Sequence, residues 1–230
     1  MALALLAGAT VQSLVGLGLG LVAAPVITMV EPELMPEVML WLACTYPIVT
    51  LDAEREDIHW AGLGWSLPTR LVGTAAGVAA VAMFSARALG LAVAVMVLLA
   101  VLVTWLAVRP PITRRSLLTA GLVSGFSGTA TSIGGPPMAI LYQDQPPRQI
   151  RTTLAVYFMV GAALSLVGLA VAGQLELRQA LLAACLAPVL PVGAALGRSL
   201  RKRLPEHQVR AAVLVLCGTS ALVLLVRSLA

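Results

Sequence analysis

Eight apolar stretches, separated by short clusters rich in arginine, proline and glutamate, make up most of this chain. In these stretches apolar residues would cover all sides of a helix. A helix on the surface of a water-soluble protein would instead carry them in a stripe along one side. Most are long enough to compare with the ~20 residues that a membrane-spanning helix needs. With 60% hydrophobic and 11% charged residues, the 230-residue chain has too little polar surface for a soluble domain. The sequence therefore predicts an all-α integral membrane protein.

Two of the eight segments differ from the others because glycines lie in their middle. We expect the segments at residues 2–29, 37–50, 63–84, 86–108, 116–143, 149–172, 177–196 and 209–229. The fifth, as a single helix, would run ~42 Å against a hydrocarbon core of ~30 Å. The central glycines of the first and fifth are Gly16, Gly18, Gly20, Gly125, Gly128, Gly134 and Gly135. We therefore predict that both segments are re-entrant hairpins of two half-helices.

The stretch SGFSGTATSIGGPPMAILYQ, residues 124–143, carries the features of an anion site. Its glycines let the backbone leave helical geometry, and Pro136 and Pro137 suit the first turn of a new helix. Serine and threonine hydroxyls lie beside this break, and the stretch carries no charged residue. A helix that begins inside a membrane presents unpaired N–H groups and a positive dipole end, which receive an anion.

The two halves of the chain resemble each other. Adding 112 to the numbering places Gly16 on Gly128, and an offset of 120 places the GxxxG step at Gly73 on that at Gly193. Small-residue faces of this kind allow close approach of helices, so we expect the third and seventh segments to pack tightly at the interface between the repeats. The chain is thus predicted to consist of two inverted repeats, residues 1–110 and 111–230, each a hairpin followed by three spanning helices.

Positive charge supports the hairpins over eight simple crossings. With eight crossings the loop arginines and lysine divide eight to six between the two sides, but with two re-entrant hairpins they divide eleven to three. The eleven are Arg55, Arg109, Arg114, Arg115, Arg148, Arg151, Arg198, Arg201, Lys202, Arg203 and Arg210. By the positive-inside rule this side faces the cytoplasm, which places both termini outside it.

Paired glycine-rich segments that end in proline, one opening each half, together with GGPP and the following Arg148 and Arg151, resemble the TauE/SafE sulfite exporter family, also called the TSUP permeases. The resemblance covers nearly the whole chain and is most specific between Gly128 and Pro137. It implies a carrier of small sulfur-containing anions, such as sulfite or organosulfonates, in a bacterial-type inner membrane.

We place the candidate substrate site between the tips of the two hairpins, where broken helices expose N–H groups without the desolvation cost of a buried charge. Its expected residues are Gln12, Ser13, Gly16, Gly18, Ser124, Gly125, Gly128, Thr129, Thr131 and Ser132. Arg70 is added as the one clearly intramembrane charge. Two interpretations of it stay open: direct binding of the anion, or snorkelling of its side chain to the membrane surface.

Other classes of function find less support. A channel-like facilitator for another small anion stays open, and an intramembrane enzyme is the alternative of a different class. His59 and His207 are expected in loops without metal-ligand spacing to an acid or cysteine, so no catalytic residue, metal or cofactor is predicted. No Asp or Glu lies deep in a segment, so coupling to protons through a buried carboxylate is not expected. The expected partners are the small anion and the lipid bilayer, without nucleic acid, and a homodimer is left open.

Overall fold

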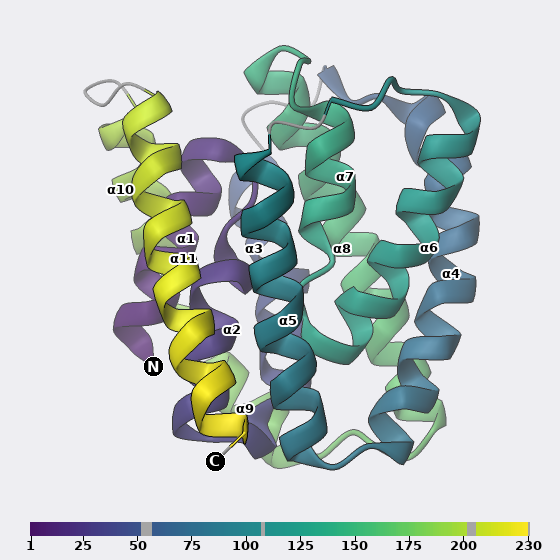
Figure 1. Ribbon diagram of the computed structural model, residues 1–230, viewed down its shortest axis with the longest axis vertical. Helices are drawn as coiled ribbons and strands as arrows, with labels where there is room; N and C mark the ends of the chain where they lie inside the picture. Colours follow the sequence, from purple (N-terminus) through teal and green to yellow (C-terminus); the bar gives the residue numbers. More distant parts are fainter. Residues whose placement is uncertain (52–56, 107–108, 202–205, 230) are drawn as a thin grey trace.

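A computed structural model describes residues 1–51, 57–106, 109–201 and 206–229. These residues form helices and no strands, which confirms the predicted all-α fold (Figure 1). The elements are α1 (Ala2–Val15), α2 (Leu19–Val30), the 3₁₀ helix η1 (Pro32–Leu34), α3 (Glu37–Thr50), α4 (Trp60–Met83), α5 (Ala86–Trp105), α6 (Arg114–Thr131), α7 (Gly135–Tyr142), α8 (Pro147–Val171), α9 (Leu177–Leu186), α10 (Val189–Leu200) and α11 (Glu206–Leu229).

The first and fifth segments are broken helices, as the glycine pattern predicts. Helix α1 ends at Gly16, whose φ of 88° is left-handed, and the chain reaches α2 through Gly18 at φ 154°. Both angles lie in the region that glycine tolerates and other residues avoid. Helix α6 ends at Ser132, also left-handed with φ 59°. Pro136 and Pro137 lie in the first turn of α7, where the missing N–H groups have no helical partner to lose.

Contacts between loops show that the second hairpin, α6–α7, returns to the end of the molecule where it began. Arg148 forms an ion pair with Asp57 at 3.0 Å, and Arg109 forms one with Asp144 at 3.2 Å, so these loops share one end. At the opposite end the Gln179 amide donates a hydrogen bond to the backbone carbonyl of Glu33. Eight simple crossings would place the members of each pair on opposite sides, so this arrangement is excluded.

The two halves pack through their broken helices. Helix α6 lies against α4, and α1 lies against α10, so each hairpin contacts the third segment of the other half. A Cβ on Gly73 would lie 2.1 Å from the carbonyl oxygen of Leu122, and one on Gly193 would lie 2.9 Å from that of Leu6. The glycine faces therefore do lie at the interface between the repeats, where the third and seventh segments make their main contacts with the hairpins.

These equivalent contacts give the two hairpins a different repeat offset from the one predicted from the sequence. Gly73 corresponds to Gly193, so Leu6 corresponds to Leu122, and the offset between α1 and α6 is 116 rather than the 112 expected from the sequence. The helix breaks agree, because Gly18 precedes α2 as Gly134 precedes α7. The offset of 112 found in the sequence differs from the structural offset by four residues, about one helical turn. Glycines recur in these segments at nearly helical spacing, so the two sequences align almost as well when one is shifted by a turn.

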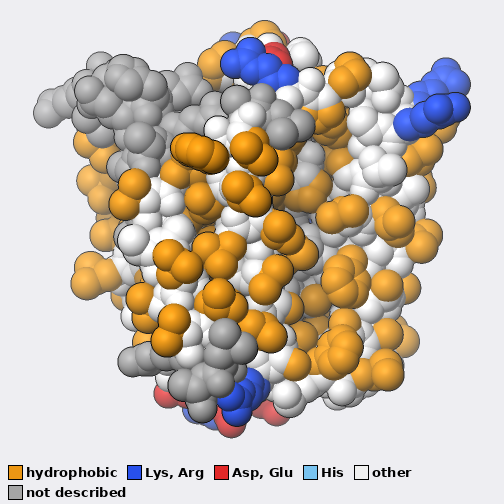
Figure 2. All heavy atoms as spheres, in the orientation of Figure 1, with side chains coloured by type: hydrophobic (Ala, Val, Ile, Leu, Met, Phe, Trp, Pro, Cys, Tyr) orange, Lys and Arg blue, Asp and Glu red, His pale blue; other side chains and the backbone are white. Residues whose placement is uncertain are grey.

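The outer surface suits a bilayer. Hydrophobic side chains cover the face shown in Figure 2, and charged side chains gather at its two ends. Among the described residues, α4, α5, α8 and the pair α9–α10 are long and apolar enough to cross a membrane. The seventh segment, expected as one helix, is interrupted at Ala187 and Pro188 because proline disfavours a helical residue before it.

Cysteine labelling tests which end faces the cytoplasm. In a variant with Cys44, Cys185 and Cys217 replaced by alanine, we expect cysteines introduced at Glu33 and Gly173 to react with an impermeant maleimide added outside intact cells. Cysteines at Ala53, Ile112, Gln145 and Leu204 are expected to react only after the membrane is permeabilised; Ala53 and Leu204 lie outside the described residues. Labelling of Ile112 or Gln145 in intact cells would reverse the orientation expected from the positive charges.

Candidate functional site

A cavity lies between the two helix breaks, with walls from both halves of the chain. It offers about 50 Å³ for the centres of water-sized molecules. One water needs ~10–15 Å³ on that measure, so the cavity has room for three to five waters or for one small oxyanion. Its lining includes Gln12, Gly18, Leu19, Gly20 and Leu21 from the first break, Gly128, Ser132, Ile133, Gly134 and Gly135 from the second, and Leu40, Arg70 and Phe158 from the surrounding helices.

Two helices begin at this cavity. Gly20 and Leu21 belong to the first turn of α2, and Gly135 is the first residue of α7. The first N–H groups of a helix have no partner within it, and the helix dipole adds positive potential there. The N–H of Leu19 is already used, because it donates to the side-chain oxygen of Gln12 at 3.0 Å, and in α7 only Gly135 offers an N–H before Met138, since Pro136 and Pro137 have none. The opposed helix starts therefore aim positive potential into one small cavity.

Arg70 adds a full positive charge to this cavity. Its side chain is 3% exposed, one guanidinium nitrogen donates to the Ser124 hydroxyl at 3.1 Å, and the group lies 4.3 Å from the centre of the Tyr157 ring. Its Nε atom is buried with no hydrogen-bond partner, and no described carboxylate forms an ion pair with it. The snorkelling interpretation is therefore wrong, because the side chain is enclosed by protein.

Gly161 makes room for the Arg70 guanidinium. A Cβ at this position on α8 would lie 1.8 Å from both Cζ and Nε of Arg70, so any larger side chain would compete for the same space. Gly128 is the second close neighbour, with its Cβ position 3.2 Å from a terminal guanidinium nitrogen. Gly128 could be predicted from the sequence but Gly161 could not, since a lone glycine in a long apolar helix carries no local signal of what packs on it.

The other predicted site residues divide into three groups. Gln12, Gly18, Gly128 and Ser132 line the central cavity together with Arg70, and the Ser132 hydroxyl donates to the carbonyl of Pro36. Ser13 and Gly16 lie in a second pocket, described next. The remaining four stand behind the cavity wall: Ser124 supports Arg70, Gly125 packs on the α4 backbone, Thr129 pairs with Ser165, and Thr131 bonds back to the Ser127 carbonyl.

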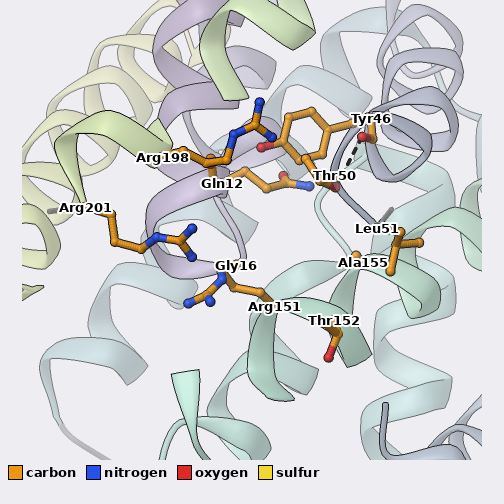
Figure 3. A pocket seen from close by; sticks show the side chains of 11 residues that line it. Gln12, Gly16, Tyr46, Thr50, Leu51, Arg151, Thr152, Ala155, Arg198 and Arg201 are labelled. Atoms are coloured by element: carbon orange, nitrogen blue, oxygen red, sulfur yellow. Dashed lines mark hydrogen bonds between the residues drawn. The ribbon is translucent and has the colours of Figure 1, made fainter. Parts of the chain in front are cut away.

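A second pocket lies beside the first, on the side of the arginine-rich end. Figure 3 shows Arg151, Arg198 and Arg201 around the space next to Gly16. Arg151 comes from α8, whereas Arg198 and Arg201 come from the end of α10. We call this pocket the basic vestibule; its other lining residues are Gln12, Ser13, Tyr46, Thr50, Leu51, Thr152 and Ala155. Sequence analysis assigned its arginines only to loops, because residues so far apart in the chain show no shared pattern.

Glu37 lies at the start of a segment and not deep in it, yet its carboxylate is buried. This side chain is 5% exposed, and its Oε2 atom has no hydrogen-bond partner among the described residues. Its position at the start of α3 suggested exposure, but α3 begins against α9 and η1, which cover it. Helical spacing places Glu37 on the same face of α3 as Leu40, which lines the central cavity. A proton-binding group is thus available one turn from that cavity.

The fold and the site together define the class of protein to which this chain belongs. The chain is a multi-pass membrane protein in which two opposed broken hairpins enclose a small, positively charged cavity, the arrangement of a secondary transporter. The family model described as Sulfite exporter TauE/SafE matches residues 1–224, so the chain belongs to that family, a family of transporters. Searches of curated proteins and of solved structures found no match.

Proposed function

We propose that this protein carries small sulfur-containing anions, such as sulfite or organosulfonates, across the inner membrane of a bacterial-type cell. The anion binds in the central cavity, where Arg70, the first N–H groups of α2 and the Gly135 N–H at the start of α7 surround it. Family membership supports the anion class, and the size of the cavity supports a small anion over a larger metabolite.

The observation that carries this proposal is the buried guanidinium of Arg70 without an ion pair to any described carboxylate. A buried charge is costly unless an opposite charge and hydrogen bonds compensate it, and intramembrane charges accordingly mark substrate pathways. An anion in the adjoining cavity supplies both. It neutralises Arg70 and accepts hydrogen bonds from the guanidinium and from the helix starts.

Flux into liposomes tests the proposal and separates it from its alternatives. Purified protein reconstituted in liposomes is expected to take up radiolabelled sulfite faster than protein-free liposomes, with competition by thiosulfate, sulfoacetate or taurine ranking the substrates. Saturation and counterflow would identify a carrier, whereas linear uptake without counterflow would identify a channel-like facilitator. Chemical conversion of sulfite by detergent-solubilised protein would instead support an enzyme.

A glycine-to-alanine change tests whether the cavity is the binding site. Gly128→Ala adds a methyl group beside Arg70 and Gly134, so it reduces the space for the anion. Overpacking of a close-fitting site costs ~1–3 kcal/mol, which corresponds to roughly five- to a hundred-fold weaker sulfite binding.

The matched control for this change lies three residues along α6. Thr131→Val alters a residue whose hydroxyl donates to the Ser127 carbonyl and accepts a long hydrogen bond, 3.3 Å, from the N–H of Ile133. Thr131 itself does not line the cavity, so sulfite affinity is expected to stay near the wild-type value. Equilibrium binding to purified protein measures both variants. Wild-type affinity in Gly128→Ala would place the anion elsewhere, and weakened affinity in Thr131→Val would bring this hydroxyl back into the site.

A further inference from the structure

The basic vestibule has the composition of an anion site in its own right. Three arginines surround it, and none of its lining residues is acidic among those that the structure describes (Figure 3). A pocket lined by one sign of charge and walled by protein concentrates the opposite ion. The hydroxyls of Tyr46, Thr50 and Thr152 in the same lining already donate to backbone carbonyls, so the arginine side chains are the groups in this lining that would bind an anion.

The vestibule and the central cavity share one wall. Gln12 lines both pockets, and its side-chain oxygen is held by the N–H of Leu19 at 3.0 Å. An amide side chain has two N–H donors besides this oxygen. With its oxygen fixed at the start of α2, Gln12 presents donors, and no negative charge, at the partition between the two pockets.

Gly16 keeps the vestibule narrow at this partition. Its left-handed backbone turns the chain away at the end of α1, and a Cβ there would lie 3.3 Å from the Cγ atom of Arg151. The backbone of the hairpin tip therefore lies directly against an arginine from the second half. An anion in the vestibule would thus contact the hairpin tip and the basic side chains of α8 and α10 together.

We propose that the vestibule is a second binding site for a small oxyanion, in series with the Arg70 cavity and joined to it across Gln12. This inference rests on the proposed function and adds a step to it. Anions from the arginine-rich end bind first among Arg151, Arg198 and Arg201. They then pass the Gln12 amide to reach Arg70, and the two sites are occupied together when the anion is abundant.

The number of bound anions tests the inference, with radiolabelled sulfite as the probe in equilibrium dialysis of purified protein. Wild-type protein is expected to bind two sulfite ions per chain. The double variant Arg198→Gln/Arg201→Gln is expected to bind one, with the affinity of the central site, and Arg70→Met is expected to bind one at the vestibule. The control Arg114→Gln/Arg115→Gln removes the same charge from residues outside both pockets and is expected to keep two.

The second measurement is the sulfite flux of a variant changed at Gln12. Gln12→Glu keeps an oxygen to accept from the Leu19 N–H and nearly the same volume, so the hairpin is expected to fold. The new negative charge stands between the two sites, and sulfite flux is expected to fall at least about ten-fold because like charges repel strongly away from water. Gln12→Glu with wild-type flux would show that anions do not pass this residue.

The outcomes separate this inference from the function on which it rests. One sulfite per chain in the wild type, lost in Arg70→Met and unchanged in Arg198→Gln/Arg201→Gln, would overturn the vestibule site and leave the central site standing. An absence of any sulfite binding would contradict the proposed function and this inference with it. Two ions per chain, each removed by its own variant, would support both.

Discussion

Replacing Arg70 by methionine is expected to abolish anion binding in the central cavity while leaving the protein at least as stable. The guanidinium faces the central cavity with a buried, unpartnered Nε atom, and hydrogen bonds to charged groups contribute ~1.5–3 kcal/mol each. Loss of two such bonds weakens sulfite binding in that cavity by more than about a hundred-fold. Methionine has a similar length and no charge, so it removes the desolvation cost that Arg70 carries when the cavity is empty.

Thermal unfolding in detergent measures both parts of this expectation. Without sulfite, Arg70→Met is expected to unfold at or above the wild-type temperature. With sulfite at a hundred times its Kd, the wild type gains ~2.7 kcal/mol from ligand binding at the central site, which the variant lacks. Arg114→Met is the control, because Arg114 also stacks on an aromatic ring, that of Trp65 at 4.8 Å, but lies on the exposed surface. An Arg70→Met protein that binds and transports sulfite normally would exclude Arg70 from the site.

Gly161→Ala is expected to have almost the same effect without touching a polar group. Its new Cβ would lie 1.8 Å from the Cζ and Nε atoms of Arg70, so the guanidinium must move out of its present place. Because the displaced atoms are the end of a flexible side chain, the helices can keep their packing. We expect sulfite flux in liposomes to fall to within a few-fold of the Arg70→Met level, with the fold retained.

A double-mutant cycle shows whether Gly161 acts through Arg70. In the Arg70→Met background the Gly161→Ala change is expected to cause no further loss of flux, because the group that it displaces is already gone. Gly64→Ala is the matched control, since a Cβ on Gly64 would meet nothing within 4 Å. Additive losses in the cycle would mean that Gly161 serves the helix packing and not the position of Arg70.

The helices and their breaks were predictable because their causes are local. Glycines in the middle of a segment and the GGPP sequence act within a few residues, and the structure breaks the chain at both places. The distribution of positive charge also favoured hairpins over eight crossings. Assigning each loop to one side of the membrane requires only the order of the segments along the chain. The ion pairs Arg148–Asp57 and Arg109–Asp144 join the loops that this count placed together.

The parts of the site that were missed depend on which face of a helix a residue occupies. Arg70 lies far enough from its helix end for either snorkelling or burial, and only the packing of α4 on α6 and α8 encloses it. Glu37 starts a helix, yet neighbouring elements cover it. The role of Gly161 depends on its contact with Arg70, which is 91 positions away in the chain. Contacts between distant segments leave no periodic pattern in a uniformly apolar sequence.

The most direct test of the central claim is sulfite counterflow in liposomes that contain the purified protein. Liposomes loaded with unlabelled sulfite and diluted into a trace of radiolabelled sulfite are expected to accumulate label transiently above its equilibrium level. Liposomes with Arg70→Met protein are expected to behave like protein-free liposomes. Transient accumulation that is equal in the wild type and in Arg70→Met, or that is absent from the wild type for sulfite and organosulfonates alike, would contradict an anion carrier centred on Arg70.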